Sequence, residues 1–290
     1  MDLLNKLYQF FLSEFAKKRI EKTILYVALF GFFIHLILIY LSNAGIVNLS
    51  LESELLKNPI SAIYTPFSFI LVYEVYLLIY YLPKSFTTYV TKQYEIITLI
   101  IIRKLFKDLS ILELSSDWFQ IKGDLQFTYD ILASIILFYL IFQFQKQGMQ
   151  KAIQQQENKP KIERFISRKK IIAISLVPIF FIMALITLAN WITGVSFGSN
   201  DLPSFETINN LFFDKFFTVL ILVDVVLLLI SFFYTDKFHK IIRNSGFVVS
   251  TILIRMSFGV SGLISTILIV VAALFGLAIL IIHNKYEKNT

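Results

Sequence analysis

The segment "LVYEVYLLIYY", residues 71–81, is an apolar run of the kind that decides the class of fold. It contains one acidic residue, Glu74. The run belongs to a block of about twenty residues, the length of a helix that crosses the hydrocarbon core of a bilayer. The 290-residue chain shares this character, with 57% hydrophobic residues, 16% charged residues and a mean hydropathy of +0.71. A water-soluble domain of this size cannot bury so much apolar surface. The composition therefore predicts an all-α integral membrane protein.

Apolar blocks recur along the chain and predict eight transmembrane helices. The blocks lie at about residues 23–42, 60–82, 92–112, 127–146, 169–193, 213–234, 246–258 and 262–283. The blocks at 92–112 and 246–258 are the weakest, because the first is flanked by charge and the second is short. An even number of spans places the N- and C-termini on the same side of the membrane.

The distribution of basic residues assigns that side. Of the 27 Lys and Arg residues, five lie on the side opposite the N-terminus, namely Lys57, Lys104, Lys107, Lys122 and Lys215. Arg103 and Arg255 lie within blocks, and the other twenty are on the side of the N-terminus. The positive-inside rule then predicts cytoplasmic termini and a multi-pass protein of the inner, or cytoplasmic, membrane. The net charge of +7 follows from this bias and requires no nucleic-acid partner.

Four regions follow from this topology. Residues 1–22 are predicted to form an amphipathic helix at the cytoplasmic interface, because their apolar residues recur at helical spacing; docking on the protein's own surface is the alternative. Residues 23–146 form a first four-helix membrane repeat and 147–168 a polar cytoplasmic linker. Residues 169–290 form a second four-helix repeat with a short tail.

The evidence for a repeat is the position of the charged residues. Glu74 in "VYEVYLLI" (72–79) corresponds to Asp224 in "LVDVVLLL" (222–229), and Arg103 and Arg255 follow 29 and 31 residues later. Four unpaired charges near the middle of the bilayer would cost roughly 10–14 kcal/mol in all. The spacing therefore predicts two buried ion pairs, Glu74 with Arg103 and Asp224 with Arg255, in parallel repeats.

Ionisable groups within a membrane mark the path of an ion or proton or a voltage-responsive element, which favours a channel or an ion-coupled transporter. The same pairs can instead hold helices in place, or one member can meet a partner subunit. The alternative function is therefore a non-transporting subunit or scaffold of a larger inner-membrane complex, and a lipid-modifying enzyme is the weakest possibility. Expected partners are the lipid bilayer, an inorganic ion or proton, and a second copy of the chain or other membrane subunits.

Four further polar residues are secondary candidates. His35 lies in the middle of the first predicted span, where a hydrogen-bonded structural role is the alternative to a proton relay. Tyr73 and Tyr76 flank Glu74 and are candidate donors to its carboxylate, although packing accounts for them equally well. Glu95 marks the cytoplasmic end of the 92–112 block, as a partner of Lys92 or the mouth of a path, with a solvated interface acid as the alternative.

No pattern points to catalysis, and neither an enzyme activity nor a metal or cofactor is expected. The chain has no cysteine, which excludes disulfides and thiolate metal sites. Its three histidines are too dispersed for a two-haem transmembrane cytochrome. The sequence contains no HExxH motif, no Walker glycine loop and no "TVGYG" filter, so a conventional potassium channel is not expected either.

Four spans with an acid in the second resemble the voltage-sensor modules of ion channels. Those modules carry a ladder of arginines on their fourth helix, and the blocks at 127–146 and 262–283 contain none. Voltage sensing is therefore not implied. The stretch from "NPISAIYTPF" to "RKLFKDLS", residues 58–110, resembles uncharacterised multi-pass proteins of Bacteroidetes-type bacteria, which implies a membrane location but no activity.

Overall fold

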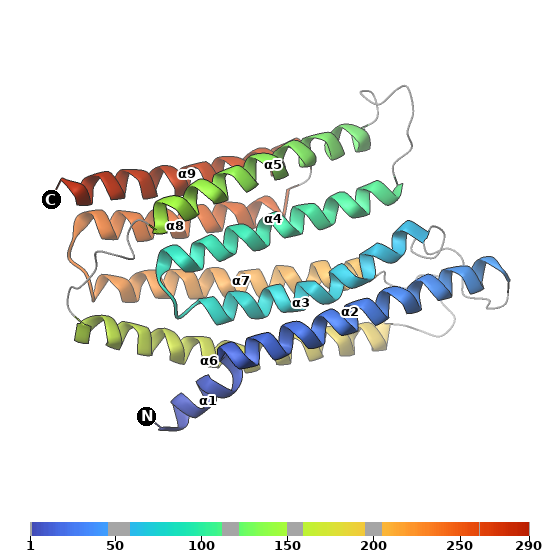
Figure 1. Ribbon diagram of the computed structural model, residues 1–290, viewed down its shortest axis with the longest axis horizontal. Coiled ribbons are helices and arrows are strands. Elements are labelled where there is room, and N and C mark those ends of the chain that lie inside the picture. Colours follow the sequence, from blue (N-terminus) through green and yellow to red (C-terminus); the bar gives the residue numbers. More distant parts are fainter. Residues whose placement is uncertain are drawn as a thin grey trace. The chain divides into compact units, whose positions relative to one another are not determined.

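The computed structural model describes residues 2–45, 59–111, 122–149, 159–194, 205–260 and 262–289 (Figure 1). Within these ranges the regular elements are helices, with no strand, so the predicted all-α fold is confirmed. The elements are α1 (Asp2–Leu12), α2 (Glu14–Asn43), the 3₁₀ helix η2 (Pro59–Ile63), α3 (Tyr64–Tyr81), α4 (Phe86–Ile111), α5 (Lys122–Met149), α6 (Lys159–Gly194), α7 (Phe205–Phe232), α8 (Phe238–Ser257) and α9 (Leu263–Lys288).

The chain divides into two compact units that do not coincide with the two predicted halves. Unit 1 comprises Met1–Tyr80 and Ile172–Leu220, and unit 2 comprises Tyr81–Ile171 and Ile221–Thr290. The helices α6 and α7 therefore each contribute one end to each unit. The duplication of a four-helix repeat stays a prediction.

In unit 1 the N-terminal helix breaks at Ser13, and α1 turns away from α2 there (Figure 1). Ser13 has an extended backbone (φ −84°, ψ 160°), and its Oγ accepts a hydrogen bond from the Ala16 N–H at 3.1 Å. This is the geometry of an N-cap, which satisfies one of the free N–H groups of the first turn. Because α2 starts at Glu14, the predicted boundary at residue 22 lies inside this helix; the apolar periodicity of residues 2–18 runs through the break and conceals it.

Three tyrosines on one face of α3 donate hydrogen bonds to this corner. Their hydroxyls reach Glu21 Oε2 (from Tyr73, 2.8 Å), the Phe11 backbone oxygen (from Tyr76, 2.9 Å) and the carboxylate of Glu14 (from Tyr80). The last carbonyls of a helix have no donor within it. The bond to Phe11 therefore completes the end of α1, and α3 stabilises the corner from the side.

We expect Ser13→Ala to lower the free energy of unfolding by about 1 kcal/mol, because the N-cap hydrogen bond is lost. Unfolding of the purified protein in mixed micelles, followed by circular dichroism, measures the change. Ser134→Ala is the matched control, since the Ser134 hydroxyl is exposed and bonds within its own helix. Equal effects of the two substitutions would show that the cap contributes nothing.

Unit 2 contains a closed arrangement of four helices. The helix α4 packs against α5, α5 against α9, α9 against α8, and α8 against α4 (Figure 1). A short turn joins α8 to α9, and it passes through Gly262 at a φ of +80°, a backbone conformation that glycine adopts without strain. The N-terminal part of α6 and the C-terminal part of α7 complete the unit.

Five helical segments of the described chain are long and apolar enough to cross a membrane: Leu4–Asn43, Leu125–Gly148, Glu163–Ile186, Lys215–Phe232 and Leu263–Lys288. The apolar segment Thr65–Tyr81 is shorter, and neither α4 nor α8 meets the same criterion. These last two helices correspond to the blocks that were weakest in the sequence. Spanning by all eight helices therefore stays a prediction, as do the sides on which the termini lie.

Unit 2 exposes apolar side chains and buries polar ones. Helix α8 exposes Ile242, Val249 and Met256, which recur every seven residues, and buries Asn244 and Arg255 among its polar residues. Helix α5 exposes Leu132, Ile135, Phe138, Tyr139 and Phe142 and buries Asp130. A water-soluble protein has the opposite distribution. This surface fits contact with lipid. Helix α8 can have a low mean hydropathy and still present an apolar stripe to lipid, because its polar side chains face the interior of the unit.

Candidate functional site

Four polar residues of unit 2 form a buried group, termed the Asp224 cluster: Asp224 on α7, Arg255 on α8, and Tyr89 and Gln93 on α4. The ion pair predicted between Asp224 and Arg255 is present, with Nη2 of Arg255 3.0 Å from Oδ2 of Asp224. The other carboxylate oxygen, Oδ1, accepts from the Tyr89 hydroxyl at 2.9 Å. Asp224 is 2% exposed and Arg255 is 6% exposed.

Gln93 bridges the ion pair. Its Oε1 accepts from Nη2 of Arg255 at 2.9 Å, and its Nε2 donates to Oδ2 of Asp224 at 3.4 Å. Tyr89 and Gln93 are one turn apart on α4, so both reach the carboxylate from the same face. The carboxylate thus receives donors from two helices besides its own, as a charge out of contact with water requires.

We expect Gln93→Leu to lower the free energy of unfolding by about 1–3 kcal/mol, because Asp224 and Arg255 each lose a buried hydrogen-bond partner. Gln143→Leu is a suitable control, since Gln143 bonds to Tyr139 at the surface. Unfolding in mixed micelles compares the two variants. If the losses are equal, the bridging amide has no energetic role.

A second buried acid, Asp130, was not predicted from the sequence. Its carboxylate accepts from Lys104 Nζ at 2.7 Å, from Gln126 Nε2 at 2.8 Å and from the Thr266 hydroxyl at 2.7 Å. These residues, termed the Asp130 cluster, come from α4, α5 and α9. Asp130 lies near the start of an apolar block and Lys104 was counted among the outside charges, so both resembled interface residues. The available signal was the pairing of opposite charges on two neighbouring predicted helices.

Glu74 and Arg103 are both buried, and they belong to different units. Their predicted ion pair stays a prediction. The structure thus places Asp224 and Arg255 together in one unit, supported by two residues, Tyr89 and Gln93, that were not among the predicted candidates.

The secondary candidates have defined partners. His35 Nδ1 lies 2.5 Å from Oγ1 of Thr65, a contact that joins α2 to α3 in unit 1. The expectation that Tyr73 or Tyr76 donates to Glu74 is corrected, because their hydroxyls donate to Glu21 and to the Phe11 backbone oxygen. A hydroxyl has a single proton to donate, and these tyrosines face the corner between α1 and α2.

Glu95 occupies a hydrogen-bonded position in unit 2. Its Oε2 pairs with Nζ of Lys92 at 2.5 Å, and its Oε1 accepts from Nε2 of Gln145 at 2.7 Å. The prediction that Glu95 pairs with Lys92 is therefore confirmed. Both members of this pair are about a quarter exposed, which separates them from the fully buried Asp224 cluster.

Among the described residues no group of three or more His, Asp and Glu side chains is arranged to hold a metal ion. The Asp224 cluster itself offers charges and hydrogen bonds. Compared with known proteins, this chain matches no protein-family model, no curated protein and no solved structure.

Proposed function

We propose that this chain is an ion-conducting or ion-coupled protein of the bacterial inner membrane, in which the Asp224 cluster is the central polar element. The observation that carries the proposal is the combination of an apolar exterior with a fully buried ion pair, Asp224 with Arg255, and a second buried carboxylate, Asp130, whose partner Lys104 is exposed. Each central charge costs about 2.5–3.5 kcal/mol to insert, so charges at this depth are retained mainly where they serve function or specific packing.

Both clusters include a residue of helix α4. This arrangement supports a continuous path for an ion or proton along that helix. Gln93 and Lys104 are eleven residues apart, about three helical turns, so they lie on one face of α4. The first belongs to the Asp224 cluster and the second to the Asp130 cluster. Polar side chains at two levels of one face offer successive positions for an ion or proton.

The alternative is a non-transporting subunit or scaffold, and one observation favours it. The carboxylates of both clusters are surrounded by protein donors, as expected for groups that fix the packing of helices. The two functions differ in whether the charges themselves are needed once the packing is preserved.

A variant that folds without the central charges separates these functions. Asp224→Asn with Arg255→Met removes both charges and retains an acceptor for Tyr89. The parent protein and the variant are reconstituted into liposomes under a proton, sodium, potassium or chloride gradient. The parent protein should dissipate one gradient, and the variant should dissipate it no faster than empty liposomes lose it.

Asp236→Asn with Lys237→Met is the matched control, because it makes the same substitutions at two exposed residues of unit 2. Flux equal to that of the parent in the first variant would exclude a path through the cluster. No flux in any gradient, together with stable co-purification of another membrane protein, would favour a scaffold.

Labelling of single cysteines tests the proposed topology, since the chain contains no other cysteine. Asn48→Cys, Ser115→Cys, Gln155→Cys and Pro203→Cys place labels in four connections outside the described residues. With eight spans, only the label at position 155 reacts from the cytoplasmic side. Labelling of position 115 from the cytoplasm would show that α4 does not cross.

A further inference from the structure

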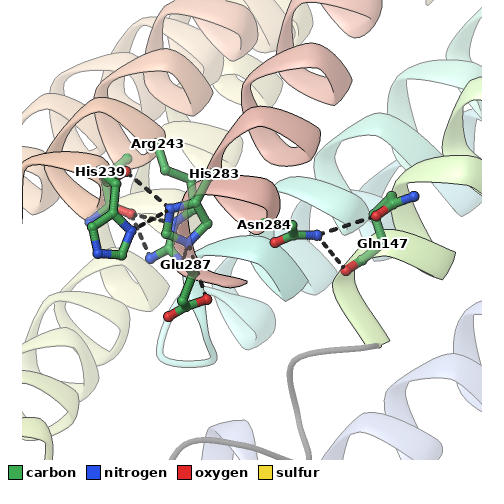
Figure 2. Close-up of polar contacts among 7 residues, drawn as sticks. Gln147, His239, Arg243, His283, Asn284 and Glu287 are labelled. Atoms are coloured by element: carbon green, nitrogen blue, oxygen red, sulfur yellow. Dashed lines mark hydrogen bonds and ion pairs between the residues drawn. The ribbon is translucent and has the colours of Figure 1, made fainter. Parts of the chain in front are cut away.

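One end of unit 2 carries another polar group, which includes two of the three histidines (Figure 2). His239 and Arg243 are one turn apart on α8, and His283 and Glu287 are one turn apart on α9. The two imidazole rings are stacked, with centroids 4.8 Å apart and planes inclined by 20°. His283 is 3% exposed. The predicted topology places this end at the cytoplasmic surface.

The hydrogen bonds of His283 determine its protonation. Nη1 of Arg243 lies 3.1 Å from Nε2 of His283, and a guanidinium has donors only, so Nε2 must accept and carries no proton. Arg243 precedes the part of α8 predicted to span. Burial lowers the pKa of Arg243 to about 10, against the opposing effect of the Glu287 carboxylate, so this residue is still a cation at neutral pH.

The other ring nitrogen, Nδ1, lies near two polar atoms of His239, one of them a backbone oxygen that can only accept. It lies 3.0 Å from Nδ1 of His239 and 3.1 Å from the backbone oxygen of that residue. A proton on Nδ1 of His283 satisfies these contacts. His283 is therefore held as the neutral Nδ1–H tautomer between Arg243 and His239.

A second proton on His283 is incompatible with this arrangement. It would place an N–H of the imidazolium against an N–H of Arg243 and bring two cations together. Oε2 of Glu287 lies 3.9 Å from the same Nε2, one turn further along α9, and its carboxylate can accept a hydrogen bond from the new N–H. Protonation would thus exchange Arg243 for Glu287 as the partner of Nε2.

Arg243 also connects this end to the helices of the Asp224 cluster. Its Nε and Nη2 donate to Oδ1 of Asn244 at 3.2 and 3.0 Å, and Nδ2 of Asn244 donates to the Ser231 hydroxyl at 3.4 Å. Ser231 is two turns after Asp224 on α7, and Asn244 is about three turns before Arg255 on α8. Release of Arg243 would therefore loosen the contact between these two helix ends.

We propose that His283 is a proton-binding site whose occupancy controls the link from Arg243 through Asn244 to α7. The groups that face it are Arg243 and His239 from α8 and Glu287 from α9, with the Tyr286 ring stacked on His239. From α5, Gln147 presents its backbone and side-chain oxygens to Asn284 beside His283 (Figure 2). The proposal does not depend on transport, because it concerns the structure of unit 2 itself.

Nuclear magnetic resonance of the unaltered protein tests the protonation directly. With nitrogen-15 in the three histidines, and the signals of His35 and His283 assigned by their loss in His35→Gln and His283→Gln, the spectrum at about pH 8 should show Nδ1 protonated and Nε2 unprotonated in His283. Acidification to about pH 5, across the range in which imidazoles titrate, should protonate Nε2. A protonated Nε2 at pH 8, or the absence of titration over this range, would overturn the proposal.

Spin labels test the consequence for the helices. Phe233→Cys, in the turn that follows α7, and Lys285→Cys on α9 place probes at two exposed residues of unit 2. Their distance distribution should shift between about pH 8 and about pH 5. His283→Gln should abolish the shift, because glutamine can accept from Arg243 but does not titrate, and the matched control His35→Gln should preserve it. Persistence of the shift in His283→Gln, or its loss in His35→Gln, would overturn the proposal.

Discussion

Arg255→Met should lower the free energy of unfolding by about 3–5 kcal/mol, because it leaves Asp224 buried without its cationic partner. Asp224 would retain only Tyr89 and Gln93 as donors, and neither carries a charge. Unfolding in mixed micelles measures the loss. Lys237→Met, which removes an exposed charge of the same unit, should change the value by less than about 0.5 kcal/mol.

The double variant Asp224→Asn with Arg255→Met should recover most of that loss. Replacing a buried ion pair by uncharged groups of similar volume is often neutral, whereas leaving one member alone is costly. Asn at position 224 also keeps an acceptor for the Tyr89 hydroxyl. If the double variant is as unstable as Arg255→Met alone, the energetic cost does not come from the isolated carboxylate.

Gly276→Ala should be the most disruptive small substitution in unit 2. A Cβ atom at this position would lie 1.9 Å from the Tyr94 hydroxyl oxygen and 3.0 Å from Oγ of Ser250. Tyr94 would have to move, which breaks its 2.6 Å hydrogen bond to Ser250 and its edge contact with Phe144. Overpacking of this kind costs about 1–3 kcal/mol, and the lost hydrogen bond adds about 1 kcal/mol.

Tyr94→Phe should restore part of the stability that Gly276→Ala removes. It would not do so if alanine at position 276 were destabilising for a reason other than the clash with the Tyr94 hydroxyl. Removal of the hydroxyl leaves a ring carbon 3.1 Å from the new Cβ, a contact that a shift of a few tenths of an ångström relieves. The double variant should therefore be more stable than Gly276→Ala alone. Gly259→Ala is the matched control, because its Cβ would meet only a backbone oxygen at 3.5 Å. A double variant less stable than either single variant would contradict the clash.

The sequence predicted the all-α fold and the Asp224–Arg255 pair for the same physical reason. Long apolar blocks require a lipid environment, and a charge within such a block requires a partner at compatible depth. Gln93 and Tyr89 could not be predicted, because both residue types are common near interfaces, and their role depends on how α4 is rotated about its axis. The rotation of α4 is set by the helices packed against it, so it cannot be read from the sequence of α4 alone.

The N-terminal break shows a different limit. An amphipathic pattern reports which residues share a face but not where the chain bends, and the N-cap Ser13 lies within a continuous periodic pattern. Asp130 was missed because it lies near the start of an apolar block, and Lys104 because it was counted among the charges on the outer side of the membrane. At such positions a solvated charge and a buried pair have the same appearance in sequence.

The contacts of α3 with the N-terminal corner also bear on how the chain is made. The tyrosines that complete this corner follow their acceptors by 52, 65 and 66 residues. At about 5–20 residues per second of synthesis, the ribosome needs roughly 3–13 s to supply them. During that interval the last carbonyls of α1 and the carboxylates of Glu14 and Glu21 lack the donors that α3 supplies in the folded protein. The corner can therefore reach its final form only after α3 has been translated.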